Sequence, residues 1–294
     1  MNNPIVEKVT REVQLSLDAS TIFEGDAATV LRRLPSNSVR CVVTSPPYWG
    51  LRDYGIDDQI GLEQTMPQFI QKLVALFAEV RRVLTDDGTL WINIGDGYTS
   101  GNRGYRAADK KNPARAMTVR PDTPEGLKPK DLMGIPWRLA FALQDDGWYL
   151  RTDIIWNKPN AMPESVKDRP TRSHEFLFMF SKSEKYFYNS DAVKQAADNG
   201  GLRNLRTVWN VNTKPYAGAH FATFPPELVR PCVKASTEPG DFVLDPFFGA
   251  GTVGLVCNEE GRKYAGVELN PSYVDLAVDR LGGIFHNVVR ISAA

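Results

Sequence analysis

Residues 241–252, with the sequence DFVLDPFFGAGT, combine a short apolar run with a glycine-rich turn. The apolar part predicts a buried strand that ends at Asp245, and the residues after the turn predict a helix. Gly249, Gly251 and Gly254 match the dinucleotide fingerprint G-x-G-x-x-G, in which glycines let a ligand lie against bare backbone near a helix start. This order of elements predicts an open α/β sheet that binds its ligand where the strands end.

The next predicted strand, residues 264–269, carries Glu268 close to its end. An acid in that position can bind the two hydroxyls of a ribose. The local pattern fits nicotinamide nucleotides as well as other ribose-bearing cofactors, and a glycine turn can also serve only to pack a strand against a helix. An NAD-dependent oxidoreductase is therefore one hypothesis.

A second stretch, residues 44–49 with the sequence TSPPYW, follows the apolar run 41–43. Neither proline can donate a hydrogen bond to a sheet, so the chain must leave the strand in a stiff turn. Tyr48 and Trp49 would then lie beyond the carboxyl end of the strand, where parallel sheets bind ligands. Taken alone, the stretch indicates a rigid exit from a strand.

The remaining sequence alternates between strand and helix patterns, as an open α/β sheet requires. Thr65 and Gln68 form a capping box at the start of a long helix. Two aromatic runs, 175–180 and 185–188, predict a hairpin that would place an antiparallel strand in the sheet. Further strands are predicted at 13–17, 21–26, 39–43, 89–94 and 148–156, and helices at 27–34, 65–84, 132–143, 227–235, 253–260 and 271–281.

The composition is that of an ordinary globular protein: of 294 residues, 42% are hydrophobic and 24% are charged, with 35 basic and 35 acidic side chains. No apolar run approaches membrane-spanning length, and the first ten residues do not resemble a secretion signal. Cys41, Cys232 and Cys257 are far apart and lie in apolar segments. We therefore expect buried thiols rather than disulfides or a metal site, and a cytoplasmic protein.

Positive charge is concentrated locally although the net charge is zero. Residues 97–130 lack apolar periodicity and are rich in glycine, proline and basic side chains, which is typical of a solvated loop and also of a clamp on a phosphate backbone. Residues 190–216 are mildly basic and rich in asparagine, so they are either a plain excursion or a small element that reads bases.

The two motifs together resemble the S-adenosylmethionine-dependent DNA amino-methyltransferases. Ser-Pro-Pro-Tyr precedes Asp-Pro-Phe-x-Gly-x-Gly-Thr, as in the permuted β class, and the segment HFATFP at 220–225 matches a third motif. The resemblance covers nearly the whole chain. It implies a Rossmann-like fold: one circularly permuted catalytic domain over 1–294, with a mostly parallel twisted sheet, an antiparallel hairpin strand and helices on both faces.

The resemblance also implies roles for the matching residues. The base-binding and catalytic residues would be Ser45, Pro46, Pro47 and Tyr48. S-adenosyl-L-methionine would be bound by Asp26, His220, Phe221, Thr223, Phe224, Asp245, Phe247, Gly249, Gly251, Thr252, Glu268 and Asn270. Double-stranded DNA would be contacted by Trp49, Arg52, Arg103, Arg106, Lys110, Lys111, Arg115, Lys158, Arg203 and Arg206. A cognate restriction endonuclease is a candidate partner, and the enzyme would be a monomer or a homodimer.

The chemistry of these residues agrees with amino methylation. An exocyclic amine on a base is a poor nucleophile, and acceptors that bind its hydrogens in the rehybridised geometry would activate it. The Ser45 hydroxyl and the Pro46 carbonyl are suited to this, and the Tyr48 ring offers a face for a flipped base. Cys41 lies inside a predicted strand, which disfavours the thiolate mechanism of carbon-5 cytosine methylation.

Serine at the first position resembles the cytosine-N4 members of the family, whereas adenine-N6 members more often carry aspartate there. N4-cytosine methylation is therefore the first hypothesis and N6-adenine methylation the second. An NAD-dependent oxidoreductase would leave residues 45–48 and the basic loop unexplained. A non-catalytic DNA-binding protein would leave the paired cofactor and catalytic motifs without a purpose.

Overall fold

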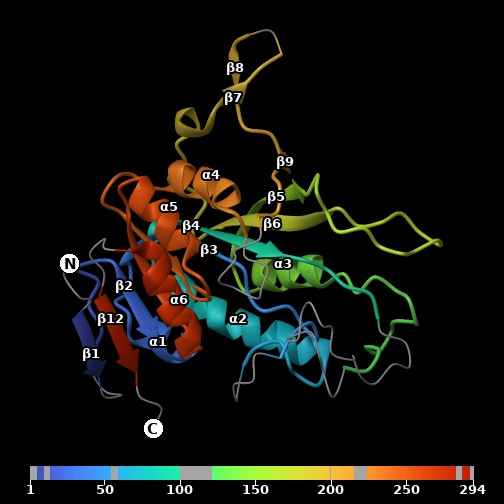
Figure 1. The fold of residues 1–294 in the computed structure, drawn as a ribbon, viewed down its shortest axis with the longest axis horizontal. Helices are drawn as coiled ribbons and strands as arrows, with labels where there is room; N and C mark the ends of the chain where they lie inside the picture. The colour runs from blue at the N-terminus through green and yellow to red at the C-terminus, as the bar shows by residue number, and fades with distance from the viewer. Residues whose placement is uncertain are drawn as a thin grey trace.

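A computed structural model describes the backbone of residues 5–9 and residues 14–53, 59–99, 121–198, 200–214, 224–282 and 287–291. Within this part, a ten-stranded sheet has the order β1-β12-β2-β11-β10-β3-β4-β6-β5-β9 (Figure 1). Its strands are β1 (Ile5–Val9), β2 (Thr21–Glu24), β3 (Val39–Thr44), β4 (Leu84–Ile94), β5 (Tyr149–Asn157), β6 (His174–Ser181), β9 (Val208–Asn210), β10 (Phe242–Asp245), β11 (Lys263–Glu268) and β12 (Asn287–Ile291).

The sheet is parallel except at β6, which pairs antiparallel with both β4 and β5. The seven central strands stand in the sheet as β2-β11-β10-β3-β4-β6-β5. When β10, β11, β2, β3, β4, β5 and β6 are numbered 1 to 7 in that sequence, this order reads 3-2-1-4-5-7-6. The order therefore reverses between β10 and β3, which are neighbours although about 200 residues separate them in the chain. Such a reversal is where open α/β sheets bind their ligands.

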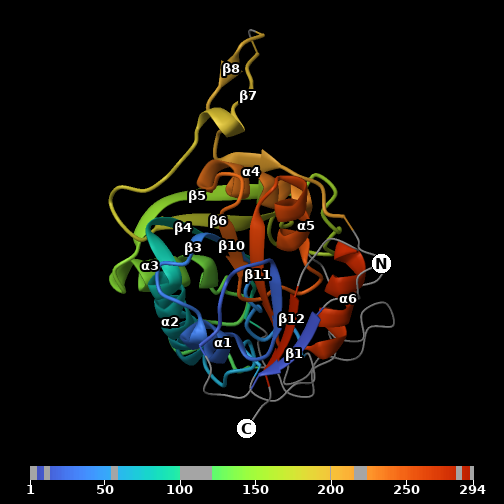
Figure 2. The ribbon, with the colours of Figure 1, turned by 90° about the vertical axis from the view of Figure 1, so that its left-hand side faces the viewer.

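Helices cover both faces of the sheet (Figure 2). One face packs against α1 (Ala27–Arg33), α2 (Met66–Val83) and α3 (Ile135–Asp145), and the other against α4 (Pro226–Ser236), α5 (Thr252–Glu259) and α6 (Pro271–Leu281). The predicted mostly parallel α/β fold with helices on both faces is confirmed.

Helix α2 shows how the sequence specifies an element. The Thr65 hydroxyl accepts from the Gln68 backbone N–H, and the Gln68 side chain accepts from the Thr65 N–H, so the predicted capping box forms. Phe69, Leu73 and Phe77 are fully buried on one side of the helix. This apolar face anchors the helix beneath β3 and β4, and the carboxyl end of β3 carries the predicted base-binding turn.

The predicted hairpin over 175–180 and 185–188 is wrong, although its antiparallel strand exists. Residues 185–188 form no strand, and β6 pairs with the neighbouring strands β4 and β5 instead. Phe187, after β6, instead packs near β3: the Arg40 guanidinium lies 4.8 Å from the Phe187 ring centre. The strand predicted at 13–17 is also wrong in its described part, because residues 14–17 are irregular.

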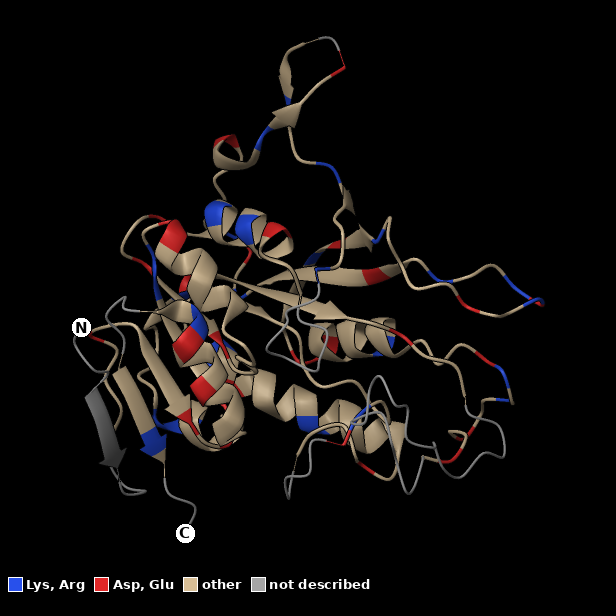
Figure 3. Ribbon diagram, in the orientation of Figure 1, with Lys and Arg blue, Asp and Glu red and all other residues tan. Residues whose placement is uncertain are grey.

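Two segments project from the sheet (Figure 1). One is the connection 158–173 between β5 and β6, and the other is an arm formed by β7 (Gln195–Ala196) and β8 (Leu202–Arg203), which pair antiparallel. Basic and acidic residues both occur along these projections (Figure 3). No helix in the described ranges is long and apolar enough to cross a membrane.

Candidate active site

The two sequence motifs meet at the reversal of strand order. Strand β3 leads into the turn 45–48, strand β10 leads into the glycine turn, and Cys41 pairs with Val243 in register. Thr44, the last residue of β3, donates its hydroxyl hydrogen to Asp245 Oδ1 over 2.6 Å. A single buried hydrogen bond therefore joins the bases of the two turns.

Asp245 anchors the glycine turn from inside the protein. Its side chain is buried, and Oδ1 also accepts from the Phe247 N–H at 3.0 Å. Burial raises the pKa of this carboxyl to about 7, against the opposing effect of these two donors. Asp245 therefore supports the proposed cofactor site from beneath the turn.

The glycine turn is shaped by tight packing beneath it and by positive φ angles. Gly249 and Gly251 have φ of 51° and 74°, which other residues adopt only with strain. A Cβ at Gly266 would lie 2.4 Å from the ring of Phe248, so this strand residue must be glycine for the ring to pack there. Phe247, in contrast, is half-buried.

Glu268 closes the site at the end of β11. Its two carboxylate oxygens accept from the Gly249 and Asn270 N–H groups, each at 2.8 Å. Burial raises the pKa of this carboxyl, while these backbone donors lower it. The Glu268 carbonyl also accepts from the Gly25 N–H at 2.9 Å, which brings the neighbouring Asp26 to the same edge.

These residues fit the ribose-bearing end of S-adenosylmethionine. Each Glu268 oxygen uses one lone pair on a backbone donor and has another for a ribose hydroxyl. A Cβ added at Gly249 would meet the Phe247 carbonyl oxygen at 4.0 Å and no other atom within that distance, apart from its chain neighbours. The turn therefore leaves room for a ligand against its backbone.

Three predicted cofactor residues have structural partners. The Asp26 Oδ1 caps helix α1 by accepting from the Thr29 N–H and hydroxyl, and Asn270 caps α6 by accepting from the Ser272 N–H. Thr252 is buried, and its hydroxyl accepts from Arg280 at 2.9 Å. The Thr252 hydroxyl is therefore directed to α6.

The base-binding turn places Tyr48 in a defined environment. Its hydroxyl donates to Glu175 Oε2 at 2.8 Å. Burial and the Glu175 charge raise the pKa of Tyr48 well above its ordinary value. Ser45 and Pro47 are half-buried and Pro46 is buried. The four predicted residues therefore lie together at the end of β3.

Glu175 and Asn93 were missed by the sequence reasoning. Asn93 Nδ2 donates to Glu175 Oε2 at 3.2 Å, and Lys158 Nζ lies 2.5 Å from Glu175 Oε1. Lys158 was predicted to contact DNA, but here its charge is paired with Glu175 and lies 4.1 Å from the Trp156 ring centre. The sequence signal that could have found Asn93 was a polar residue at the end of a buried strand. The same signal applies to Asp96, whose carboxylate accepts from the Gly134 and Ile135 N–H groups.

Trp49, which was predicted to contact DNA, is turned into the core in this structure. The indole is only 6% exposed, packs in the core under α2, and donates to the Glu63 carbonyl at 2.9 Å. The turn is folded inward because the Gly50 N–H bonds to the Gly61 carbonyl at 2.8 Å. Arg52 lies just beyond, half-buried, with its carbonyl accepting from Gln59.

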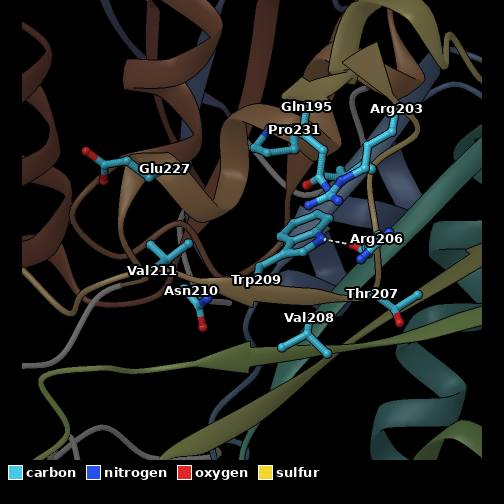
Figure 4. Close-up of a pocket in the computed structure, with 11 residues that line it drawn as sticks. Gln195, Arg203, Arg206, Thr207, Val208, Trp209, Asn210, Val211, Glu227 and Pro231 are labelled. Carbon is cyan, nitrogen blue, oxygen red and sulfur yellow. Dashed lines mark hydrogen bonds between the residues drawn. The ribbon is translucent and has the colours of Figure 1, made fainter. Parts of the chain in front are cut away.

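Described residues of the predicted recognition segment 190–216 border an open cleft of about 890 Å³ beside α4 (Figure 4). Arg203 and Arg206 both line it, and Arg203 is also ion-paired with Asp198 at 3.1 Å. Trp209 fixes this wall of the cleft, because its buried indole donates to the Arg206 carbonyl at 2.6 Å.

Phe224 is the first described residue after a gap, and it is half-buried against the core beside α4 and α5. Other predicted site residues lie outside the described part of the chain: the cofactor residues His220, Phe221 and Thr223 and the basic residues Arg103, Arg106, Lys110, Lys111 and Arg115. Their roles stay predictions.

A model of the N6/N4 DNA methylase family matches residues 39–279. The chain belongs to this family.

Three relatives described as Type II methyltransferases align along almost their full length. M.XycI of Xanthomonas campestris pv. cyanopsidis is 79% identical over 98% of this chain and 96% of its own. M.Cfr9I of Citrobacter freundii is 76% identical over the same shares, and M.SmaI of Serratia marcescens is 56% identical over 95% and 97%.

Solved structures agree with this DNA methylase fold. The PvuII DNA methyltransferase, described as cytosine-N4-specific, is 21% identical and covers 96% of this chain and 90% of its own, with a TM-score of 0.68. A DNA modification methylase of Thermus thermophilus, solved with S-adenosyl-L-methionine, is 26% identical over 92% and 99%, with a TM-score of 0.61. The predicted membership of the S-adenosylmethionine-dependent DNA amino-methyltransferases is confirmed, and the oxidoreductase hypothesis is wrong.

Proposed function

We propose that this Type II DNA methyltransferase methylates the exocyclic N4 of cytosine in a specific double-stranded DNA sequence. The observation that carries the proposal is Ser45, which stands at the first position of the Ser-Pro-Pro-Tyr turn, three residues before Tyr48. Family members with serine there resemble the cytosine-N4 enzymes. N6-adenine methylation is the alternative that the first experiment must exclude.

The cofactor is S-adenosyl-L-methionine, which supplies an electrophilic methyl group when bound. Glu268 would accept hydrogen bonds from the ribose hydroxyls, and Gly249 and Phe247 would line the cofactor at the glycine turn. Asp245 holds this turn to Thr44 and so to the end of β3. The protein thereby sets the distance between the cofactor turn and the base-binding turn, which is the main requirement for an in-line transfer.

The residues of the second turn would activate the base. The cytosine would leave the duplex and stack on the Tyr48 ring. The Ser45 hydroxyl and the Pro46 carbonyl would accept hydrogen bonds from the N4 amine as its lone pair localises on nitrogen. Pro46 and Pro47 restrict the backbone, so the carbonyl keeps its direction.

The first experiment identifies the modified nucleoside. The purified enzyme is incubated with isotope-labelled S-adenosyl-L-methionine and unmethylated bacterial genomic DNA, which is then digested to nucleosides and analysed by mass spectrometry. We expect labelled N4-methylcytosine. Labelled N6-methyladenine would refute the base assignment, and the absence of transfer would refute the activity. Single-molecule sequencing of the same DNA would give the recognition sequence.

A variant tests the role of Ser45 separately. Ser45→Ala removes one acceptor of the amine hydrogens, so kcat should fall by roughly 10–100-fold while the KM for S-adenosyl-L-methionine stays unchanged. Glu79→Gln, in a partly exposed ion pair with Arg82 on α2, is a matched control at a distant site. An unchanged kcat in Ser45→Ala would contradict this role.

We also propose the biological setting. A Type II methyltransferase protects DNA from a restriction endonuclease of the same specificity, so such an endonuclease is the proposed partner. This function also places the enzyme in the cytoplasm, with the DNA. Digestion of DNA from expressing cells with endonucleases that cut at the mapped site would test the protection.

A further inference from the structure

We propose that Glu175 is a positioning residue for methyl transfer, which acts by fixing the orientation of the Tyr48 ring. Within the proposed function, this inference rests on the stacking role of Tyr48 and not on which base is methylated. Lys158 and Asn93 contribute to this positioning, because both bind the Glu175 carboxylate, which in turn holds the Tyr48 ring.

The topology brings Glu175 to the site. Strand β6 runs antiparallel to its neighbours, so its first residues lie at the edge where β3, β4 and β5 end. In register, Phe176 faces Ile94, the last residue of β4, and Glu175 faces Trp156 near the end of β5. An acid at the start of an antiparallel strand thus lies among residues at the ends of parallel strands.

The contacts of Glu175 come from three different strand ends. Oε2 accepts from the Tyr48 hydroxyl at 2.8 Å and from Asn93 at 3.2 Å, and Oε1 pairs with Lys158. The side chains of Glu175 and Lys158 are 20% and 17% exposed. Hydrogen bonds to an ionised, largely shielded group are stronger than those between neutral groups. The carboxylate is therefore a firm anchor for the phenol.

The ring of Tyr48 is held at two points. Its hydroxyl is bound by Glu175, and its edge lies against the backbone directly after β4, since a Cβ at Gly95 would be 2.7 Å from Tyr48 Cε2. An aromatic ring fixed in this way presents one face in one direction. A flipped base then stacks at a set distance from the methyl donor, and a small misplacement of a reacting group costs a large factor in rate.

The same turn carries the residue proposed to activate the amine. Ser45 lies three positions before Tyr48 in the chain, and Pro46 and Pro47 between them restrict the backbone. Fixing the Tyr48 ring therefore also limits the movement of the turn that carries Ser45. Loss of Glu175 should lower kcat more than it weakens cofactor binding.

The test is a double-mutant cycle with Tyr48→Phe and Glu175→Gln, measured with tritiated S-adenosyl-L-methionine and unmethylated genomic DNA. Tyr48→Phe keeps the ring but removes the anchored hydroxyl, and Glu175→Gln keeps the side-chain shape but removes its charge. We expect each variant to lower kcat by about tenfold, with the KM for S-adenosyl-L-methionine unchanged. The double variant should be no slower than either single variant, because both break the same contact.

Several outcomes would overturn the inference. A kcat within twofold of wild type in Glu175→Gln would do so, as would a double variant that shows the product of the two single effects. Glu79→Gln should match wild type throughout. If Glu175→Gln is unfolded by circular dichroism, Lys158→Met takes its place in the cycle, and additivity with Tyr48→Phe refutes the proposal. If the wild type transfers methyl to adenine, only the base assignment fails, whereas no transfer refutes both proposals.

Discussion

Without cofactor, the free energy of unfolding of the Asp245→Asn variant should rise relative to that of the wild type as the pH rises. The carboxyl is buried at 1% exposure, and burial raises its pKa from 3.8 to about 7. Between these two values, the folded state keeps a proton that the unfolded state has lost. The free energy of unfolding of the wild type therefore falls with rising pH across this window. An asparagine does not titrate, and its Oδ1 can accept from Thr44 and Phe247 as the carboxyl does.

The magnitude follows from the shift. Three pKa units correspond to about 4 kcal/mol in total, of which roughly 2–3 kcal/mol is lost by the wild type between pH 5 and pH 8. The difference in unfolding free energy between Asp245→Asn and wild type should grow by about this amount over the same range. Taking the difference cancels the other titrating groups, which both proteins share.

The assay is urea denaturation followed by tryptophan fluorescence at pH 5, 6, 7 and 8, without cofactor. Asp145→Asn, at an exposed position on α3, is the control and should show no such trend. A difference between Asp245→Asn and wild type that stays constant from pH 5 to pH 8 would refute the reasoning. It would mean that Asp245 is ionised throughout or that its site opens to water.

Three further substitutions test the packing around the site. Thr65→Ala removes a capping-box hydroxyl and should cost about 1 kcal/mol of unfolding free energy in urea denaturation; no change would show that the cap is not needed. Gly266→Ala should cost roughly 1–3 kcal/mol because its Cβ meets the Phe248 ring, and Phe248→Leu should restore part of the loss; absence of rescue would contradict the clash. Trp49→Phe removes the hydrogen bond to the Glu63 carbonyl and should cost roughly 1–2 kcal/mol of unfolding free energy. DNA affinity, measured by fluorescence anisotropy, should stay within twofold of wild type; a tenfold loss would support a DNA contact by Trp49.

The sequence predicted elements whose signals are local. The capping box at Thr65, the strand before the glycine turn and the acid at Glu268 all lie where their patterns indicate, because each depends on a few neighbouring residues. The resemblance of the two motifs then gave the family. These features place the two turns at one edge of the sheet.

The errors arose where distant residues decide the structure. The aromatic run 185–188 has a strand-like pattern, but β6 already pairs on both sides with β4 and β5, so no sheet edge is available for a hairpin. Trp49 was expected to face outward, and the inward turn depends on Gly50 bonding to Gly61. Glu175 could not be found, because its role exists only when an antiparallel strand delivers it to Tyr48.

The neighbouring positions of β3 and β10 have a consequence for the synthesis of the chain. Strand β3 leaves the ribosome about 200 residues before its partner, and the bond from Thr44 to Asp245 spans 201 positions. During translation, the edge of β3 that β10 will cover therefore stays unpaired, which is the state in which strands associate with other chains. A nascent chain that stops before residue 242 would have its base-binding turn but no opposite wall. The growing chain thus has no methylating activity, and is most exposed to aggregation, until β10 and the cofactor turn after it have been translated.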